Sequence, residues 1–160
     1  MGVIDARLAE LGLALPEPPA PVASYVPFVK TGSMVFVSGQ VSMGDKGVIK
    51  GRLGAGFDLS AGKYAARWCG LNLLAQLKVA CAGDLDRVRR VVKLGGFVAV
   101  ERGFPQIPQV INGCSDLMQE VFGDDIGRHA RAAVGVAELP LGAAVEVDGV
   151  FEIGDSAQPG

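Results

Sequence analysis

The chain has 160 residues, of which 49% are hydrophobic and only 20% are charged, and its mean hydropathy is +0.34. This composition excludes a disordered polymer and favours one folded domain with a substantial core. The 15 basic and 17 acidic residues give a net charge of −2 and a pI near 5.4, which disfavours nucleic acid as a partner. High hydropathy in so small a chain also indicates that some apolar surface is shared with another subunit.

No apolar stretch reaches about 18 residues without an Arg, Lys or Gly, so no membrane-spanning segment is expected. Charged residues between positions 5 and 10 also interrupt the apolar stretch that a signal peptide needs. The three cysteines, Cys69, Cys81 and Cys114, are odd in number and widely spaced, which favours reduced thiols and a cytoplasmic location. Together with a single histidine they form no recognisable zinc site, so no metal is expected.

The first third of the chain predicts a helix, a connector and a hairpin. Apolar residues at helical spacing predict a short amphipathic helix over 3–11, and a proline-rich connector follows it up to residue 21. Two strand-like runs, 25–30 and 34–38, flank a Thr-Gly-Ser turn and predict a hairpin. The glycine-rich segment 41–59 predicts a long loop, in which 48–50 is a candidate short strand.

The rest of the chain predicts helices over 60–82 and 108–122 and strands over 88–100, 131–139 and 145–153. Gly83 and Gly123 follow the two helices as natural C-terminal stops. This order predicts one α+β domain over residues 1–160, with a mostly antiparallel mixed sheet and two helices packed on one face. Residues 1–21 form its lead-in, 22–153 its core and 154–160 a frayed tail.

The last two strands contain the most informative charges. If they form a hairpin around Pro140, Glu146 lies near Gly135, and alternation places Arg131 and Glu146 together on the face away from the helices. Val134 and Val136 then face the helices. Arg131 and Glu146 would lie about 13 Å apart, too far to hold one very small molecule together. Either a ligand or a loop spans this gap, or two subunits contribute one group each.

Several segments resemble the Rid family, the reactive-intermediate imine deaminases that are also known as YjgF-like or endoribonuclease L-PSP proteins. They are Val35-Phe36-Val37-Ser38-Gly39-Gln40, Ala130-Arg131, Glu138-Leu139-Pro140 and Val145-Glu146-Val147. The similarity covers about residues 22–153 and includes the helix end at Ala82-Gly83 with the following Asp86-Arg87-Val88. The resemblance implies a chorismate-mutase-like fold, a homotrimer and ligand clefts between subunits.

The deaminases of this family hydrolyse reactive 2-imino or enamine acids to 2-keto acids and ammonia, and they need neither metal nor cofactor. The resemblance implies that Arg131 holds the substrate carboxylate, because a guanidinium matches a carboxylate bidentately. It implies that Glu146 orients and deprotonates the attacking water as a general base. It assigns four further residues to the substrate pocket: Tyr25, Ser38, Gly39 and Asn112.

The chain also departs from the compact deaminases in its longer 41–59 loop, its longer 103–122 segment and an additional Gly127-Arg128-His129 sequence. These departures indicate a divergent subgroup. We expect Arg52 or the Arg128-His129 pair to extend the anion site toward a second acidic or polar group of the substrate. One alternative is a non-catalytic protein that binds or senses small carboxylates. Another is RNA cleavage, which the family's endoribonuclease name implies and the acidic pI disfavours.

Overall fold

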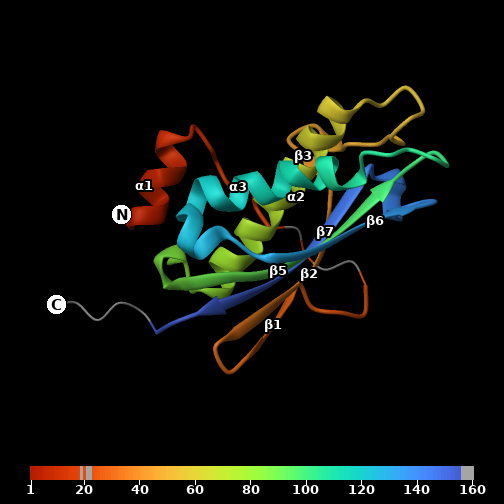
Figure 1. The fold of residues 1–160 in the computed structure, drawn as a ribbon. Helices are drawn as coiled ribbons and strands as arrows, with labels where there is room; N and C mark the ends of the chain where they lie inside the picture. Colours follow the sequence, from red (N-terminus) through yellow and green to blue (C-terminus); the bar gives the residue numbers. More distant parts are fainter. Residues whose placement is uncertain (19, 21–22, 156–160) are drawn as a thin grey trace.

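A computed structural model of the chain describes residues 1–18, 20 and 23–155. Two long helices cover one face of a five-stranded sheet, and a short N-terminal helix lies beside them (Figure 1). The helices are α1 (Val3–Glu10), α2 (Leu59–Ala80) and α3 (Ile107–Gly127). The strands are β1 (Phe28–Thr31), β2 (Met34–Val41), β3 (Met43–Gly44), β4 (Gly47–Val48), β5 (Val88–Ala99), β6 (Ala130–Val136) and β7 (Val145–Ile153). The predicted α+β class and the two-helix layer are confirmed.

Helix α2 begins and ends where the sequence predicts. The Asp58 carboxylate accepts a hydrogen bond from the backbone N–H of Ala61 at 2.8 Å, which satisfies a donor of the first turn. At the other end Gly83 has φ +92° and donates its backbone N–H to the Lys78 carbonyl at 2.8 Å. A glycine adopts this left-handed conformation without a Cβ clash, so the helix stops there.

Helix α3 starts with Pro108 in its first turn and loses helical geometry at Gly123, whose φ is +78°. One more turn then continues to Gly127. Helices α2 and α3 pack so closely that a Cβ on Gly70 of α2 would lie only 2.7 Å from Leu117 Cδ2 of α3. Helix α1 is anchored at its N-terminus by Asp86, whose carboxylate accepts from the backbone N–H groups of Val3 and Ile4 at 2.8 Å each.

The sheet has the strand order β1-β2-β7-β5-β6, and only the β5–β6 pair is parallel. The predicted hairpin over 25–38 is confirmed as β1–β2. The predicted hairpin of the last two strands is wrong, because β6 pairs with β5 while β7 lies between β2 and β5. Helix α3 joins β5 to β6 as a crossover, which makes these strands parallel, and residues 137–144 then carry the chain past β5.

The predicted faces of the 131–139 strand are also wrong. Ala133 packs against the core, and a Cβ on Gly135 would lie 2.9 Å from Ile107 of α3, so Arg131, Ala133 and Gly135 face the helix layer. Val134 lies on the open face and is 46% exposed. Small residues are needed toward α3 because the helix lies so close to this edge of the sheet, and the more apolar residues therefore point away from it.

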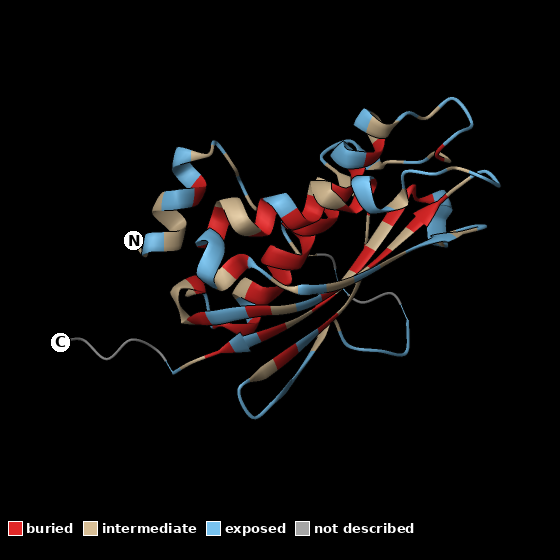
Figure 2. Ribbon diagram, viewed as in Figure 1, coloured by how far each residue is buried: buried red, intermediate tan, exposed pale blue. Residues whose placement is uncertain are grey.

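The core lies between the helix layer and one face of the sheet (Figure 2). Along β7, Val145, Val147, Phe151 and Ile153 are buried, as the predicted alternation requires. The segment 41–59 contains a small β3–β4 hairpin in place of one strand at 48–50, and Leu53 within it is fully buried. Residues 156–160 of the predicted tail and residues 19 and 21 of the predicted connector lie outside the described residues.

Within the described ranges, none of the helices combines the length and the hydropathy that a membrane span requires.

Candidate functional site

The predicted site residues divide between two pockets. Tyr25, Gly39 and Glu146 line a pocket of about 290 Å³, which we call the carboxylate pocket. Asn112 and Arg131 line a second pocket of about 340 Å³, which we call the guanidinium pocket. The tertiary structure therefore brings together the expected residues in two groups and not in one.

In the carboxylate pocket, Glu146 extends from β7 on the open face of the sheet, opposite Phe97 of β5. Gly39 lies on β2, where the pairing with β7 shifts between Val37 and Gln40. A Cβ on Gly39 would lie 2.8 Å from Glu146 Oε1. A side chain at this position would therefore force the Glu146 carboxylate to move.

Two of the predicted hydroxyl residues have different surroundings. Tyr25 is 54% exposed and lies at the rim of the carboxylate pocket. Ser38 Oγ donates to the Val26 carbonyl at 2.7 Å, and Ser38 is not among the residues that line this pocket. The Ser38 hydroxyl therefore holds the chain segment that carries Tyr25 against β2.

The surroundings of Glu146 suit a proton acceptor. Burial raises the pKa of the Glu146 carboxyl above its ordinary value, and the neighbouring Asp148 carboxylate raises it further. Asp148 lies two residues away on the same face of β7, and burial raises its pKa as well. A carboxylate with an elevated pKa holds protons more strongly than a free one, which makes it a better general base.

Sequence reasoning missed three amides that line the carboxylate pocket: Gln40, Asn72 and Gln76. All three are buried, and Asn72 Nδ2 donates to the carbonyls of Met43 at 2.9 Å and Trp68 at 2.8 Å. The available signal is the spacing of Asn72 and Gln76, which lie one turn apart in an otherwise apolar helical segment.

In the guanidinium pocket, three hydrogen bonds fix the orientation of Arg131. Nη1 donates to Asn112 Oδ1 at 2.7 Å and to Ser115 Oγ at 3.1 Å, and Nη2 donates to the Pro108 carbonyl at 3.2 Å. All three acceptors belong to α3, so the helix holds the guanidinium from one side. A guanidinium has five N–H donors. With respect to the described residues, Nε–H and one Nη2–H thus remain available for a ligand.

The same pocket contains most of the additional basic sequence that precedes Arg131. Arg128 and His129 line it together with Ser115, Asp116 and Gln119. Ser115, which sequence reasoning missed, forms a hydrogen bond between its hydroxyl oxygen and His129 Nε2 over 2.8 Å. Arg52, by contrast, pairs with Glu101 at 3.5 Å and lines a different pocket, so it lies apart from the Arg131 site.

Within one chain, Arg131 and Glu146 lie on opposite faces of the sheet. Arg131 is paired with Leu94 on β5, whereas Glu146 is paired with Phe97 on the other side of the same strand. This register separates the two backbone positions by about 10 Å along the strands and about 10 Å across them, or about 14 Å in all. The prediction that both side chains share the open face is wrong, because Arg131 turns toward α3.

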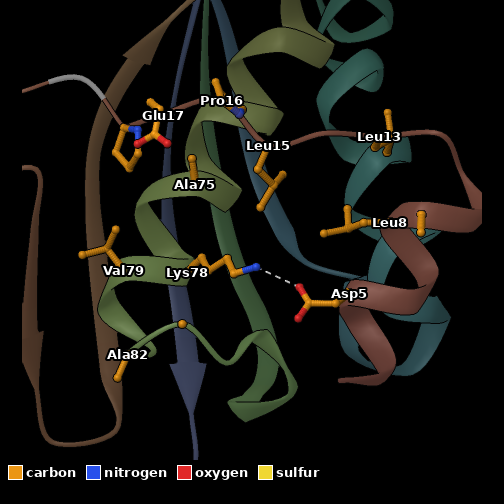
Figure 3. A pocket seen from close by; sticks show the side chains of 13 residues that line it. Asp5, Leu8, Leu13, Leu15, Pro16, Glu17, Ala75, Lys78, Val79 and Ala82 are labelled. Carbon is orange, nitrogen blue, oxygen red and sulfur yellow. Dashed lines mark hydrogen bonds and ion pairs between the residues drawn. The ribbon is translucent and has the colours of Figure 1, made fainter. Parts of the chain in front are cut away.

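A third, larger pocket of about 670 Å³ lies between α1, the segment that follows it, and α2 (Figure 3). Its wall is mainly apolar and includes Leu8, Leu13 and Leu15, and Lys78 Nζ pairs with Asp5 at 2.9 Å. None of the predicted site residues lies there.

The thiols are poorly suited to chemistry. All three cysteines are buried, and burial raises the pKa of Cys114 to about 12. Among the described residues there is also no group of three or more His, Cys, Asp or Glu side chains that could hold a metal ion.

Comparison with known proteins identifies relatives over nearly the whole chain. Residues 5–152 match the family described as "YjgF/chorismate mutase-like, putative endoribonuclease". A protein of Trypanosoma cruzi named TCP17 is 48% identical over 153 residues, which are 95% of each chain. The Agrobacterium tumefaciens protein Atu1372, described as of unknown function, has a crystal structure that matches with a TM-score of 0.86 and 47% identity, covering 95% of this chain and 94% of that one. A 2-iminobutanoate/2-iminopropanoate deaminase of Dermatophagoides farinae is 29% identical over 143 residues, 88% of this chain and 94% of that protein.

Proposed function

The chain belongs to the YjgF/chorismate mutase-like family, and on this premise we propose that it hydrolyses small 2-imino or enamine acids to 2-keto acids and ammonia. The observation that carries the proposal is the geometry of Arg131, which α3 holds through three hydrogen bonds while two N–H groups remain for a ligand. Two donors on one planar group suit a carboxylate. The named deaminase among the relatives supports the same substrate class.

In the proposed reaction Arg131 binds the substrate carboxylate, and Asn112, whose oxygen is engaged by Arg131, offers its amide N–H groups to the substrate. Glu146 removes a proton from a water molecule, which adds to the electrophilic imine carbon. The Glu146 carboxyl returns this proton to the nitrogen of the resulting carbinolamine, the C–N bond breaks to release ammonia, and the hydroxyl loses its proton as the 2-keto acid forms.

We propose further that the active unit is a homotrimer in which Arg131 of one subunit meets Glu146 of the next. The separation of about 14 Å and the opposite faces argue against a site within one chain. The open face of the sheet also carries exposed apolar side chains, including Val29 (51%), Phe36 (46%) and Val134 (46%). Apolar surface of this kind is typical of a subunit interface. Light scattering at micromolar concentration should give a mass near three chains, and a stable monomer would contradict the composite site.

In the decisive experiment an amino-acid oxidase produces the 2-imino acid in the presence of this protein. Semicarbazide then traps the 2-imino acid that has not been hydrolysed, and the semicarbazone is measured. We expect the protein to lower the semicarbazone yield from several amino acids. Arg52→Ala is the matched control, since Arg52 lies in another pocket and should leave the rate unchanged. If the wild-type protein binds 2-keto acids but hydrolyses no imine in the panel, it is a binding or sensing protein instead.

A further inference from the structure

A chain of hydrogen bonds runs from the backbone of α3 to the guanidinium of Arg131. His129 Nδ1 lies 2.7 Å from the Gly127 carbonyl oxygen, and His129 Nε2 lies 2.8 Å from Ser115 Oγ. A carbonyl only accepts hydrogen bonds, so Nδ1 must carry the proton in the neutral imidazole and Nε2 must be the acceptor. Ser115 therefore donates to His129 while it accepts from Arg131 Nη1 at 3.1 Å.

The environment of His129 favours the neutral imidazole over the imidazolium in the ligand-free protein. Burial lowers the pKa of the imidazole below its ordinary value, the Arg131 charge lowers it further, and the Gly127 carbonyl acts in the opposite direction. Other charges around it are Asp116 of α3 and Arg128, which line the same pocket. On the adjacent strand β5, Lys93 is paired with Ala130 and interacts with Asp148 on the open face, and Arg90 Nη1 donates to the Asp125 carbonyl of α3 at 2.9 Å.

We propose that Ser115 and His129 are positioning residues for Arg131, and that His129 takes up one proton when an anion binds to the guanidinium. This inference rests on the proposed role of Arg131 as a carboxylate clamp. A bound carboxylate offsets the Arg131 charge that disfavours the imidazolium, so the two binding events favour each other.

Proton uptake also rearranges the hydrogen bonds consistently. The new Nε2–H donates to Ser115 Oγ, which then accepts from both His129 and Arg131 through its two lone pairs. The Ser115 hydrogen is released from Nε2 and becomes available to an acceptor in the pocket, such as the bound anion. Protonation thus converts Ser115 from a donor to His129 into a donor toward the ligand.

The sign of the pH dependence follows from this coupling. Because the complex holds one more proton than the free protein, anion affinity should rise as the pH falls through the pKa of His129. The limit is about tenfold per pH unit for one linked proton. Glu146 of the next subunit is the other titratable group of the proposed site, and its pKa is raised, so the linkage is measured in Glu146→Gln chains. In these chains, without the imidazole, affinity should vary little between pH 5 and 8, where the carboxylate of a 2-keto acid and Arg131 both remain charged.

The test uses NMR because His129 is the only histidine in the chain, so its ring signals need no assignment. Long-range ¹H–¹⁵N spectra of the wild-type protein at pH 8 should show the tautomer with the proton on Nδ1. Saturating pyruvate should raise the titration midpoint of His129. Calorimetry uses chains that all carry Glu146→Gln, which removes the other titratable group of the proposed site. These chains should bind pyruvate more tightly at pH 5.5 than at pH 8, whereas adding His129→Gln should abolish this difference and adding Arg52→Ala should retain it.

The outcomes separate the inference from the proposed function. If pyruvate binds but leaves the His129 midpoint unchanged, the proton linkage is wrong and the carboxylate clamp stands. If neither pyruvate nor any other 2-keto acid binds between pH 5 and 8, the clamp is wrong and the linkage falls with it. Ser115→Ala supplies a second check, because it should reduce the midpoint shift even if His129→Gln does not fold.

Discussion

The carboxylate pocket and the guanidinium pocket are built from the same sheet but differ in how their central charge is held. Arg131 makes three hydrogen bonds to α3, which fix its guanidinium in one orientation. Glu146 is instead half-buried beside Asp148, in surroundings that disfavour its charged form. A fixed cation suits binding, whereas a carboxylate with a raised pKa suits proton transfer. The comparison teaches that each pocket holds one half of the proposed chemistry and that neither is complete alone.

The largest expected effect comes from removing the fixed cation. Arg131→Ala should abolish both 2-keto acid binding and imine turnover, because the other guanidinium that lines the pocket, that of Arg128, is exposed, whereas three hydrogen bonds to α3 fix Arg131. Calorimetry with pyruvate and the oxidase-coupled assay measure the two properties. Retained binding in this variant would show that the pocket does not hold the substrate carboxylate.

Removing the proton acceptor should separate rate from binding. Glu146→Gln keeps the shape of the side chain but cannot accept a proton from water, so turnover should fall by about 10²–10⁴-fold while the affinity for pyruvate changes little. The same two assays apply. An equal loss of affinity and rate would assign Glu146 to ligand binding.

Mixed assemblies test whether the two pockets meet across subunits. When Arg131→Ala and Glu146→Gln chains are co-refolded in equal amounts, random trimers should give about one quarter of the sites an intact Arg131 and an intact Glu146. Activity should therefore rise from the level of the single variants to about one quarter of the wild-type value. If both groups acted within one chain, mixing would restore nothing.

A smaller effect concerns substrate selectivity in the guanidinium pocket. Arg128 lines this pocket and is exposed, so its contribution to holding a second carboxylate should resemble that of a surface ion pair. Arg128→Ala should weaken binding of a dicarboxylic 2-keto acid by about two- to fivefold and leave pyruvate binding unchanged. Arg52→Ala, in its separate pocket, should change neither affinity, and an equal loss for both ligands would argue against a second anion subsite.

The smallest expected effect is on stability. Folding raises the pKa of the Glu146 carboxyl. The contribution of this carboxyl to the free energy of unfolding is therefore complete below the pKa that it has in the unfolded chain, and it is lost as the pH rises through the pKa that it has in the folded chain. Glu146→Gln should therefore raise Tm at pH 7 by a few degrees at most and have no such effect near pH 4. Thermal denaturation at both pH values measures this, and a lower Tm at pH 7 would mean that the carboxylate stabilises the fold.

Much of the fold was predictable because it depends on local sequence. The helical period over 60–82 and the stops at Gly83 and Gly123 need no knowledge of distant residues, and α2 and α3 follow them closely. The pairing of 131–139 with 145–153 was not predictable in this way. Strand pairing depends on which distant segments compete for the same edge of the sheet. Here β6 pairs in parallel with β5, to which the α3 crossover connects it.

The candidate site shows the same division. Family motifs indicated Arg131, Glu146, Tyr25 and Gly39, and the structure places each of them at a pocket. Asn72 and Gln76 were missed because the mainly apolar pattern of this helix predicts core packing and does not indicate a role for its few polar residues. Ser115 was missed because its significance comes from His129 and Arg131, which are distant in sequence.

The sequence by itself determined the secondary structure elements, the α+β class and the residues able to bind a carboxylate or accept a proton. Only the tertiary structure decided that Arg131 faces α3 while Glu146 faces the open side of the sheet. The physical reason is that alternation along a strand separates two sets of side chains without telling which set the helices cover. At β6 the helix side is closely packed, since a Cβ on Gly135 would lie 2.7 Å from Val100 Cγ2 and 2.9 Å from Ile107 Cδ1 of α3.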